Sequence, residues 1–275
     1  MSTEINSEAP IFLLKVFGAR GSMPVEGNEF SIYGGATSCF RVRAGNEEIY
    51  LDGGSGIATA KPSADARITI LLTHMHLDHI IGLPFFPALS ERGRALDIYA
   101  DTRAGLSPQD AIDRMISPPY WPLKLGDYPS TLTMHDVPRG GFSIGDVVID
   151  AIEGTHPSGS TIFKLTRHGK SIVYATDFEH SDAERYRALI EFAADCDLLM
   201  YDAQYTPEEY ERCRGFGHST AEVGIDIADQ CGAKKILFVH HAPNRTDDQL
   251  RRLEKIFVER NPNVTFAKIG EEIFL

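Results

Sequence analysis

The sequence predicts an α+β protein, an αβ/βα sandwich in which two β-sheets are flanked by helices. Short apolar runs typical of strands fill the first half of the chain, and helical patterns alternate with strands in the second half. The last helix expected, over 247–259, has one apolar face. A length of 275 residues suits one large layered domain, so we expect a single domain over residues 1–275.

Apolar runs and turn signals define the strands expected in the first half. Residues 11–17 form an apolar run that ends in a glycine-containing loop. Two further runs, 38–43 and 48–51, are joined by Ala-Gly-Asn and are expected to form a hairpin. The next buried strand is expected over 67–73, and a short helix is expected to follow its histidine-rich end and to stop at Pro84.

Residues 117–129 are predicted to form an irregular surface loop. Four prolines lie in this segment together with Tyr120, Trp121 and Tyr128, and prolines interrupt helices and strands. The loop is a candidate wall of an active site, and its aromatic rings are candidates for stacking on a base. The alternative is that these rings anchor the loop by burial.

The second half of the chain is predicted to alternate strands and helices. Helices are expected over 182–193 and 219–229, and a last helix over 247–259 places three apolar side chains on one face. A further apolar strand ends at Asp202. The remaining strands are expected at 131–135, 147–152, 161–166, 171–175 and 236–239.

The charge balance argues against a protein that grips long nucleic acid. Lysine and arginine number 27 against 39 acidic residues, and the net charge is −12. Residues 1–10 lack the basic start and apolar stretch of a secretory signal, and no apolar run is long enough to span a bilayer. Four cysteines without CxxC spacing suit a reducing compartment. We expect a cytoplasmic protein that engages neither membranes nor extended nucleic acid.

The segment 74–79, His-Met-His-Leu-Asp-His, is typical of a metal site. It directly follows an apolar strand, so one turn at the strand end presents several imidazoles and a carboxylate to one point. Imidazole nitrogen and carboxylate oxygen are ligands that zinc accepts, as do iron and manganese. The alternative is a polar loop with scattered histidines, which this spacing after a strand argues against.

With this segment the chain resembles the metallo-β-lactamase superfamily, whose hallmark is the pattern HxHxDH, and the resemblance spans nearly the whole chain. It is most similar to the phosphodiesterase branch, which includes ribonuclease Z and the cyclic-nucleotide phosphodiesterases. The resemblance implies the metallo-β-lactamase fold. The further segments that carry it are 18–24, 33–39, 51–56, 154–157 (Gly-Thr-His-Pro), 174–177 (Tyr-Ala-Thr-Asp), 217–220 (Gly-His-Ser-Thr) and 238–241 (Phe-Val-His-His).

The resemblance implies two divalent metal ions, with zinc expected first and manganese or iron as alternatives. The implied ligands are His74, His76 and His156 for one metal, Asp78, His79 and His240 for the other, and Asp177 as a bridge. The later residues have ordinary alternatives: His156 as a turn histidine, Asp177 as a helix cap, and His241 in place of its neighbour as the ligand.

The resemblance also implies roles beside the metal ligands. His218 is expected just before a helix, with Ser219 as the N-cap of a capping box, and is expected to bind the phosphate or to protonate the leaving group. Asp78 is expected to accept a proton as well as to bind metal. Asp52 and Asp202, each at a strand end, are expected to orient ligand histidines.

The function expected from the resemblance is that of a dinuclear metal-dependent hydrolase, a phosphodiesterase that uses a metal-bridging hydroxide. Ribonuclease Z carries a long arm that holds tRNA between the positions of His156 and Asp177, which are too close here for such an arm. A small phosphodiester such as a cyclic nucleotide is therefore the expected substrate, and a homodimer the expected assembly. The alternatives are a ribonuclease Z-like endonuclease, a hydrolase of lactones, thioesters or C–N bonds, and a non-enzymatic sensor of metal or nucleotide.

Overall fold

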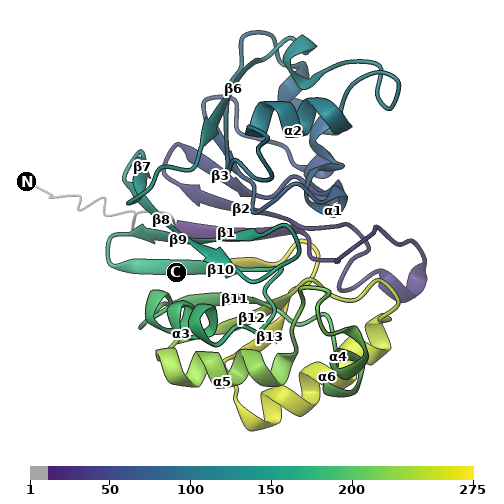
Figure 1. Cartoon of the computed structure of the whole chain (residues 1–275), viewed down its shortest axis with the longest axis vertical. Coiled ribbons are helices and arrows are strands. Elements are labelled where there is room, and N and C mark those ends of the chain that lie inside the picture. The colour runs from purple at the N-terminus through teal and green to yellow at the C-terminus, as the bar shows by residue number, and fades with distance from the viewer. Residues whose placement is uncertain (1–11) are drawn as a thin grey trace, which may run out of the picture.

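Two seven-stranded β-sheets pack face to face, and helices cover the outer face of each sheet (Figure 1). The computed structural model describes residues 12–275. The interpretation of residues 1–10, and the first residue of the expected strand 11–17, therefore lie outside the described residues. The predicted αβ/βα sandwich is confirmed.

The first sheet combines an antiparallel half with a parallel half. The strands Cys39–Ala44 and Glu47–Leu51 pair antiparallel, which confirms the predicted hairpin. The last four strands in the spatial order are parallel, and the first three pair antiparallel. In spatial order the strands are β14 (Glu272–Phe274), β1 (Phe12–Gly18), β2 (Cys39–Ala44), β3 (Glu47–Leu51), β4 (Arg67–Leu71), β5 (Ala95–Ala100) and β6 (Thr131–Asp136).

The second sheet has the same mixed character. Its first four strands in the spatial order are parallel, and the remaining strands pair antiparallel. In spatial order the strands are β13 (Val264–Phe266), β12 (Ile236–Val239), β11 (Leu198–Asp202), β10 (Lys170–Ala175), β9 (Ser160–Arg167), β8 (Val147–Gly154) and β7 (Phe142–Ile144). Each sheet therefore contributes a set of parallel strands whose carboxyl ends share one edge.

The helices divide between the two outer faces. α1 and α2 lie on the side of the first sheet, whereas α3, α5 and α6 cover the second (Figure 1). None of the helices within residues 12–275 is both long and apolar enough to cross a membrane. The helices are α1 (Leu77–Ile80), α2 (Pro108–Met115), α3 (Ala183–Phe192), α4 (Pro207–Cys213), α5 (Ala221–Cys231) and α6 (Asp247–Arg260).

Three apolar layers hold the sandwich together. Side chains such as Phe40 and Leu165 fill the layer between the sheets. A second layer joins α3, α5 and α6 to the second sheet, and a third, with Ile112 of α2, covers the first sheet. Because both faces of each parallel half are covered, β4 and β12 are nearly continuous apolar runs rather than alternating ones.

Two local predictions were wrong. The short helix does not follow His79 but begins at Leu77, inside the histidine segment, and Pro84 does not end it. Pro84 instead lies in the first turn of a separate 3-10 helix, Leu83–Phe85, where a missing N–H costs little. The N-cap of α5 is Thr220, whose side chain accepts from the Val223 N–H, rather than Ser219.

Ser219 cannot serve as that cap because its hydroxyl has other partners. Its Oγ lies 2.8 Å from the hydroxyl of Tyr201 and 2.8 Å from Nδ1 of His180. The side chain is fully buried between these two rings. The sequence signal placed the cap one residue too early, and the contacts of the serine instead fix the backbone directly after His218.

The predicted irregular loop 117–129 is anchored by two of its three aromatic residues. Trp121 Nε1 donates to the hydroxyl of Tyr128 at 3.1 Å, and that hydroxyl donates to the Pro84 carbonyl at 3.0 Å. Tyr120 is 77% exposed. The alternative that aromatic rings anchor the loop therefore holds for Trp121 and Tyr128. Of the three rings, that of Tyr120 faces solvent.

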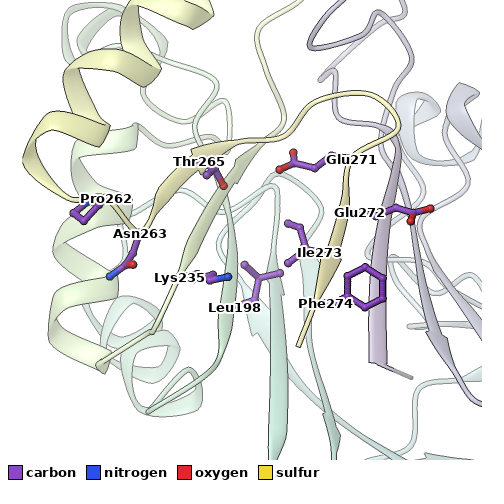
Figure 2. Close-up of a pocket in the computed structure, with 9 residues that line it drawn as sticks. All are labelled: Leu198, Lys235, Pro262, Asn263, Thr265, Glu271, Glu272, Ile273 and Phe274. Carbon is purple, nitrogen blue, oxygen red and sulfur yellow. The ribbon is translucent and has the colours of Figure 1, made fainter. Parts of the chain in front are cut away.

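A cavity of about 340 Å³ lies between β13 and β14, the end strands of the two sheets (Figure 2). Leu198 and Lys235 line it at the amino ends of β11 and β12, together with Glu271. β11 and β12 run away from the cavity and end at Asp202 and Val239 at the far end of the sheet. None of the predicted site residues lines the cavity, which therefore lies outside the candidate site.

Arg20 ties the loop after β1 to the loop after β12. Its buried guanidinium donates to the carbonyl of Gly34 at 2.7 and 3.1 Å, to that of Ala242 at 2.9 Å and to that of Arg245 at 2.8 Å. The backbone on either side of Arg20 also pairs with His241. The arginine therefore fixes the chain segment that directly follows His240.

We expect Arg20→Met to lower the free energy of unfolding by about 3 kcal/mol or more, because each buried carbonyl left without a donor costs about 1–3 kcal/mol. Urea denaturation measures the change. Arg251→Met is the matched control, since Arg251 is largely exposed and pairs with Asp248 one helical turn away. Equal midpoints for the two variants would contradict the role given to Arg20.

Candidate metal centre

The candidate ligands lie where parallel strands of both sheets end. β4 of the first sheet leads into His74, whereas β10 and β12 of the second lead into Asp177 and His240. His74 Nε2 lies 3.8 Å from Asp177 Oδ1, and His240 Nε2 lies 3.3 Å from Asp177 Oδ2. Side chains from two sheets therefore meet at one point.

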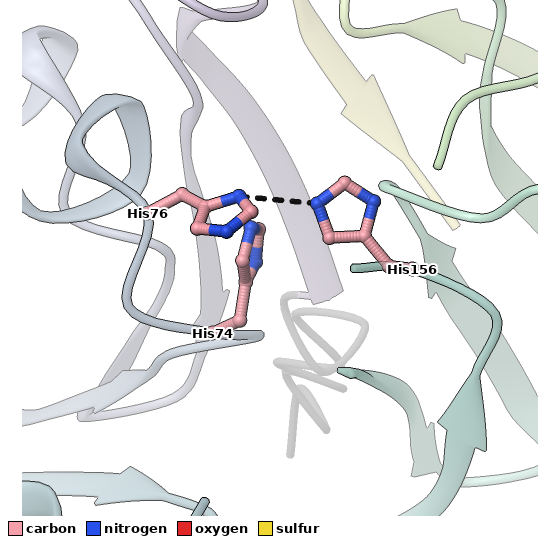
Figure 3. Close-up of side chains that lie close together, drawn as sticks. All are labelled: His74, His76 and His156. Atoms are coloured by element: carbon pink, nitrogen blue, oxygen red, sulfur yellow. Dashed lines mark hydrogen bonds between the residues drawn. The ribbon is translucent and has the colours of Figure 1, made fainter. Parts of the chain in front are cut away.

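His74, His76 and His156 form the first group (Figure 3). One nitrogen from each ring lies within 4.8 Å of the other two, and Nδ1 of His76 is 3.1 Å from Nε2 of His156. His74 is buried, His156 half-buried and His76 exposed. Three converging imidazole nitrogens with one exposed side are typical of a transition-metal site that keeps a position open.

Asp78, His79 and His240 form the second group, and all three are buried. Oδ2 of Asp78 lies 3.3 Å from Nε2 of His79 and 3.2 Å from Nε2 of His240. His241 points away from the group, because its Nε2 donates to the Ala267 carbonyl at 2.9 Å. Of the two adjacent histidines, the structure therefore brings His240 into the cluster and leaves His241 outside it.

Asp177 lies between the two groups and presents one oxygen to each. Its Oδ1 is 3.8 Å from Nε2 of His74 and 3.6 Å from Nε2 of His156. Its Oδ2 is 3.2 Å from Nε2 of His79 and 3.3 Å from Nε2 of His240. A carboxylate in this position is able to bridge two cations.

Three residues around the centre have left-handed backbone conformations. Asp52, Asp177 and His240 have φ values of 61°, 52° and 61°, although none is glycine. They follow β3, β10 and β12 within two residues. Such conformations are uncommon outside glycine and cluster at functional sites. They end the extended strands abruptly at the residues whose side chains meet in the centre.

Asp52 holds the ring of His79. Nδ1 of His79 donates to Oδ2 of Asp52 at 2.7 Å, which leaves Nε2 facing Asp78 and Asp177. The Tyr174 hydroxyl donates to the same carboxylate oxygen at 2.8 Å. A histidine ligand held through its other nitrogen has a fixed orientation and a fixed tautomer.

Asp202 holds His218 in a similar way. Nδ1 of His218 donates to Oδ2 of Asp202 at 2.9 Å, and the same oxygen accepts from the Asp177 backbone N–H at 3.1 Å. The His218 ring stacks on that of His240 with centroids 4.7 Å apart. Its Nε2 is therefore the ring nitrogen left for a ligand, beside the second group.

Sequence reasoning missed Glu179, which shapes the loop before His218. Its buried carboxylate accepts from the backbone N–H groups of Gly215 at 2.9 Å and Gly217 at 3.0 Å, and from the Tyr210 hydroxyl at 3.1 Å. A single glutamate carries no sequence signal that separates this role from that of a surface acid.

The two carboxylates of the cluster face histidine rings rather than lysine or arginine. Among the residues that the structure describes, the ion pairs of Asp78 and Asp177 all join histidines. Burial lowers the pKa of His156 to about 4 and that of His74 well below its usual value, which keeps both rings in the neutral form that binds metal. Burial also opposes charge on His240, but Asp177 and Asp78 outweigh it and raise the pKa to about 9.

Two buried ring nitrogens point to the same conclusion. Nε2 of His74 and Nε2 of His79 have no hydrogen-bond partner. Buried polar atoms without partners are rare and costly, so each calls for an explanation. Divalent metal ions at the two ligand groups would satisfy both nitrogens and balance the two carboxylates, and the residues present therefore fit such ions.

Comparison with known proteins gives relatives over most of the chain. A ribonuclease Z from Natronomonas pharaonis is 22% identical over 233 residues, which cover 68% of this chain and 71% of the relative. A ribonuclease Z from Archaeoglobus fulgidus is 26% identical over 290 aligned positions, with 89% and 92% covered. The crystal structure of the metallo-β-lactamase fold protein YhfI from Bacillus subtilis matches with a TM-score of 0.71 at 18% identity, covering 97% of this chain and 100% of that one, which shows a shared fold.

A family described as "Beta-lactamase superfamily domain" matches residues 47–241. This span begins at β3 and ends directly after His240, so it includes both candidate ligand groups and Asp177. Members of this superfamily bind divalent metal, in agreement with the cluster of imidazoles and carboxylates. The chain belongs to the metallo-β-lactamase superfamily, in the phosphodiesterase branch that includes ribonuclease Z.

Proposed function

We propose that this chain, a metal-dependent hydrolase, cleaves a small phosphodiester such as a cyclic nucleotide with two divalent metal ions, zinc first among them. The observation that carries the proposal is the position of Asp177, with one oxygen toward each ligand group. Two bound metal ions would activate a water molecule and neutralise the charge that develops on the phosphate. The geometry of Asp177 supports two ions better than one.

The chain's own residues would move the protons. Asp78 would accept a proton from the attacking water, and the Ser22 backbone N–H donates to its Oδ2 at 2.7 Å, which fixes the carboxylate. His218 would donate a proton or a hydrogen bond from Nε2 to the phosphate or the leaving oxygen, since Asp202 occupies its Nδ1.

Two observations support a small substrate. The segment between His156 and Asp177 contains β9 and β10, an antiparallel hairpin joined by a tight turn at 168–169, and leaves no length for a protruding arm. The net charge of −12 also opposes binding of a long polyanion.

An RNA endonuclease is the second candidate. The relatives from Natronomonas pharaonis and Archaeoglobus fulgidus are both ribonucleases Z, and the second aligns over 89% of this chain. This chain would have to hold an RNA substrate with surfaces other than an arm between His156 and Asp177.

One set of assays separates the candidates. Zinc-loaded protein is offered 2′,3′- and 3′,5′-cyclic nucleotides, linear diesters, precursor tRNA and a lactone, after elemental analysis of its metal content. We expect two metal ions per chain and turnover of a small phosphodiester. Turnover of precursor tRNA alone would favour the second candidate. Turnover of the lactone alone would show that the phosphodiesterase proposal is wrong.

We expect Asp52→Asn to weaken zinc binding about 10- to 100-fold, because loss of a carboxylate that orients a ligand histidine has effects of this size. Competition with a chromophoric chelator measures the affinity. Tyr174→Phe is the matched control, since it removes another hydrogen bond to Asp52 but leaves the bond to His79 in place. Equal affinities in the two variants would speak against the orienting role.

We expect His218→Ala to keep its metal but to lose about 10²- to 10⁴-fold in kcat, the usual contribution of a general acid. Elemental analysis and steady-state kinetics on the same preparation test both parts. His135→Ala is the control, because His135 pairs with Asp97 on the first sheet, outside the cluster. Near-normal kcat at full metal content would exclude this role for His218.

Three expectations from the sequence stay predictions. They are the homodimer, the cytoplasmic location and the organisation of residues 1–275 as one domain. We retain all three as part of the proposal, and none of the experiments above depends on them.

A further inference from the structure

We propose that a small apolar cavity beside His74 and His76 binds one ester group of the substrate and selects phosphodiesters that carry a single aromatic ring there. This proposal rests on the proposed function, because it places the phosphate at the candidate metal centre. The cavity has a volume of about 190 Å³. It does not include the exposed Tyr120, which lies over a different depression.

The cavity opens directly beside the first ligand group. His74 and His76 line one side of it, and Gly159 lines another. Gly159 belongs to the turn that follows His156, and its N–H donates to the His156 carbonyl at 2.8 Å. Because two of the three histidines of the first ligand group line the cavity, a substituent on a phosphate held at these histidines would lie within reach of it.

The remaining wall is mostly apolar. Its apolar residues are Met75, Ala104, Leu106 and Ala111, the last from helix α2, and its polar residues are Asp101, Arg103 and Ser158. Burial of apolar surface in such a cavity stabilises a ligand at about 25 cal/mol per Å². The lining therefore favours a ring or an alkyl group over a second charged phosphate.

Arg103 also borders the cavity, but its charge is already neutralised. Its Nη1 donates to Glu153 at 2.7 Å, and its Nη2 donates to the Thr161 hydroxyl at 2.8 Å and lies 3.4 Å from Asp101. Both terminal nitrogens of the guanidinium are thus used within the protein. Arg103 offers little attraction to an additional anion, which argues against a nucleic-acid chain passing through the cavity.

The same arginine joins two walls of the cavity. It reaches from the segment after β5 to Glu153 in β8 and Thr161 in β9. A Cβ on Gly159 would collide with its guanidinium, so the glycine permits this close approach. The cavity is therefore held in shape before a ligand arrives, and a preformed cavity lowers the entropic cost of binding.

The volume sets the size of the group that fits. An apolar cavity of about 150 Å³ is able to hold a benzene ring. A cavity of about 190 Å³ suits one such ring with its linking atom rather than a pair of fused rings. The preferred substrate class is therefore a phosphodiester with one single-ring ester group.

Binding of phosphonates tests the cavity without relying on turnover. Calorimetry compares phenylphosphonate with methylphosphonate on the zinc-loaded protein, and we expect the phenyl compound to bind roughly tenfold more tightly or better. Ala111→Phe, which fills the cavity, should bring this ratio close to one. Met115→Phe on the same helix borders the neighbouring depression instead and should leave the ratio unchanged.

A second variant covers the case in which Ala111→Phe fails to fold. Leu106→Ala widens the same cavity and should shift the preference toward naphthylphosphonate. A wild-type ratio near one, or a ratio that neither cavity variant changes, would overturn the proposal. A ratio that Met115→Phe changes as much as Ala111→Phe does would overturn it as well.

Hydrolysis then separates this proposal from the proposed function. Methyl p-nitrophenyl phosphate and phenyl p-nitrophenyl phosphate share a leaving group and differ only in the second ester group. A higher kcat/KM for the phenyl ester that Ala111→Phe abolishes would support both proposals. Equal kcat/KM values would leave the phosphodiesterase intact and overturn the cavity. No turnover of either ester, with the phosphonate preference intact, would count against the phosphodiesterase and for the cavity.

Discussion

The buried carboxylate of Asp177 is the constraint on which the geometry of the candidate metal centre depends. A carboxylate in the interior is costly unless positive charge and hydrogen-bond donors surround it. Here its partners are imidazoles from the end of β4 in the first sheet and from the end of β12 in the second, with the turn after β8 supplying His156. The two sheets must therefore pack so that the carboxyl ends of their parallel halves face each other. The apolar layer between the sheets sets that alignment, and the centre depends on it.

The rings around Asp177 are held by contacts that reach back into the sheets. Asp52 and Asp202 stand at the ends of β3 and β11 and hold His79 and His218 through their Nδ1 atoms. The left-handed backbone at Asp52 and at two residues of the centre costs on the order of 1–3 kcal/mol at each position. Such strain persists only where the surrounding packing fixes it, and these residues follow, within two positions, strands that are buried along all or nearly all of their length. The rigidity of the sandwich thus keeps the ligand geometry in place.

The sequence predicted the parts of this structure that depend on local pattern. The segment 74–79 carries its ligands within one turn, so composition and spacing suffice to find it. His156 and Asp177 are isolated in the sequence and were found only through a resemblance between ordered motifs. Glu179 and Arg103 act through partners far away in the chain, which no local pattern encodes. Short end strands such as β13 were missed because three residues give too little periodicity. The cap misplaced at Ser219 has a different origin, since tertiary contacts with Tyr201 and His180 overrode the local signal.

A protein with a net negative charge repels an anionic substrate overall, so positive charge close to the binding site must attract that substrate. Fields from surface charges are screened over about 8 Å at physiological ionic strength. A small diester that reaches the centre would experience mainly the nearby cations, whereas a long polyanion would extend across a chain whose net charge is −12. Arg103, the cation beside the cavity next to His76, is already paired with acidic side chains and would not help to hold such a strand. Under the proposed function, the charge distribution that suits a divalent metal centre would favour a short substrate, and the shape and apolar lining of the adjoining cavity would discriminate between substrates.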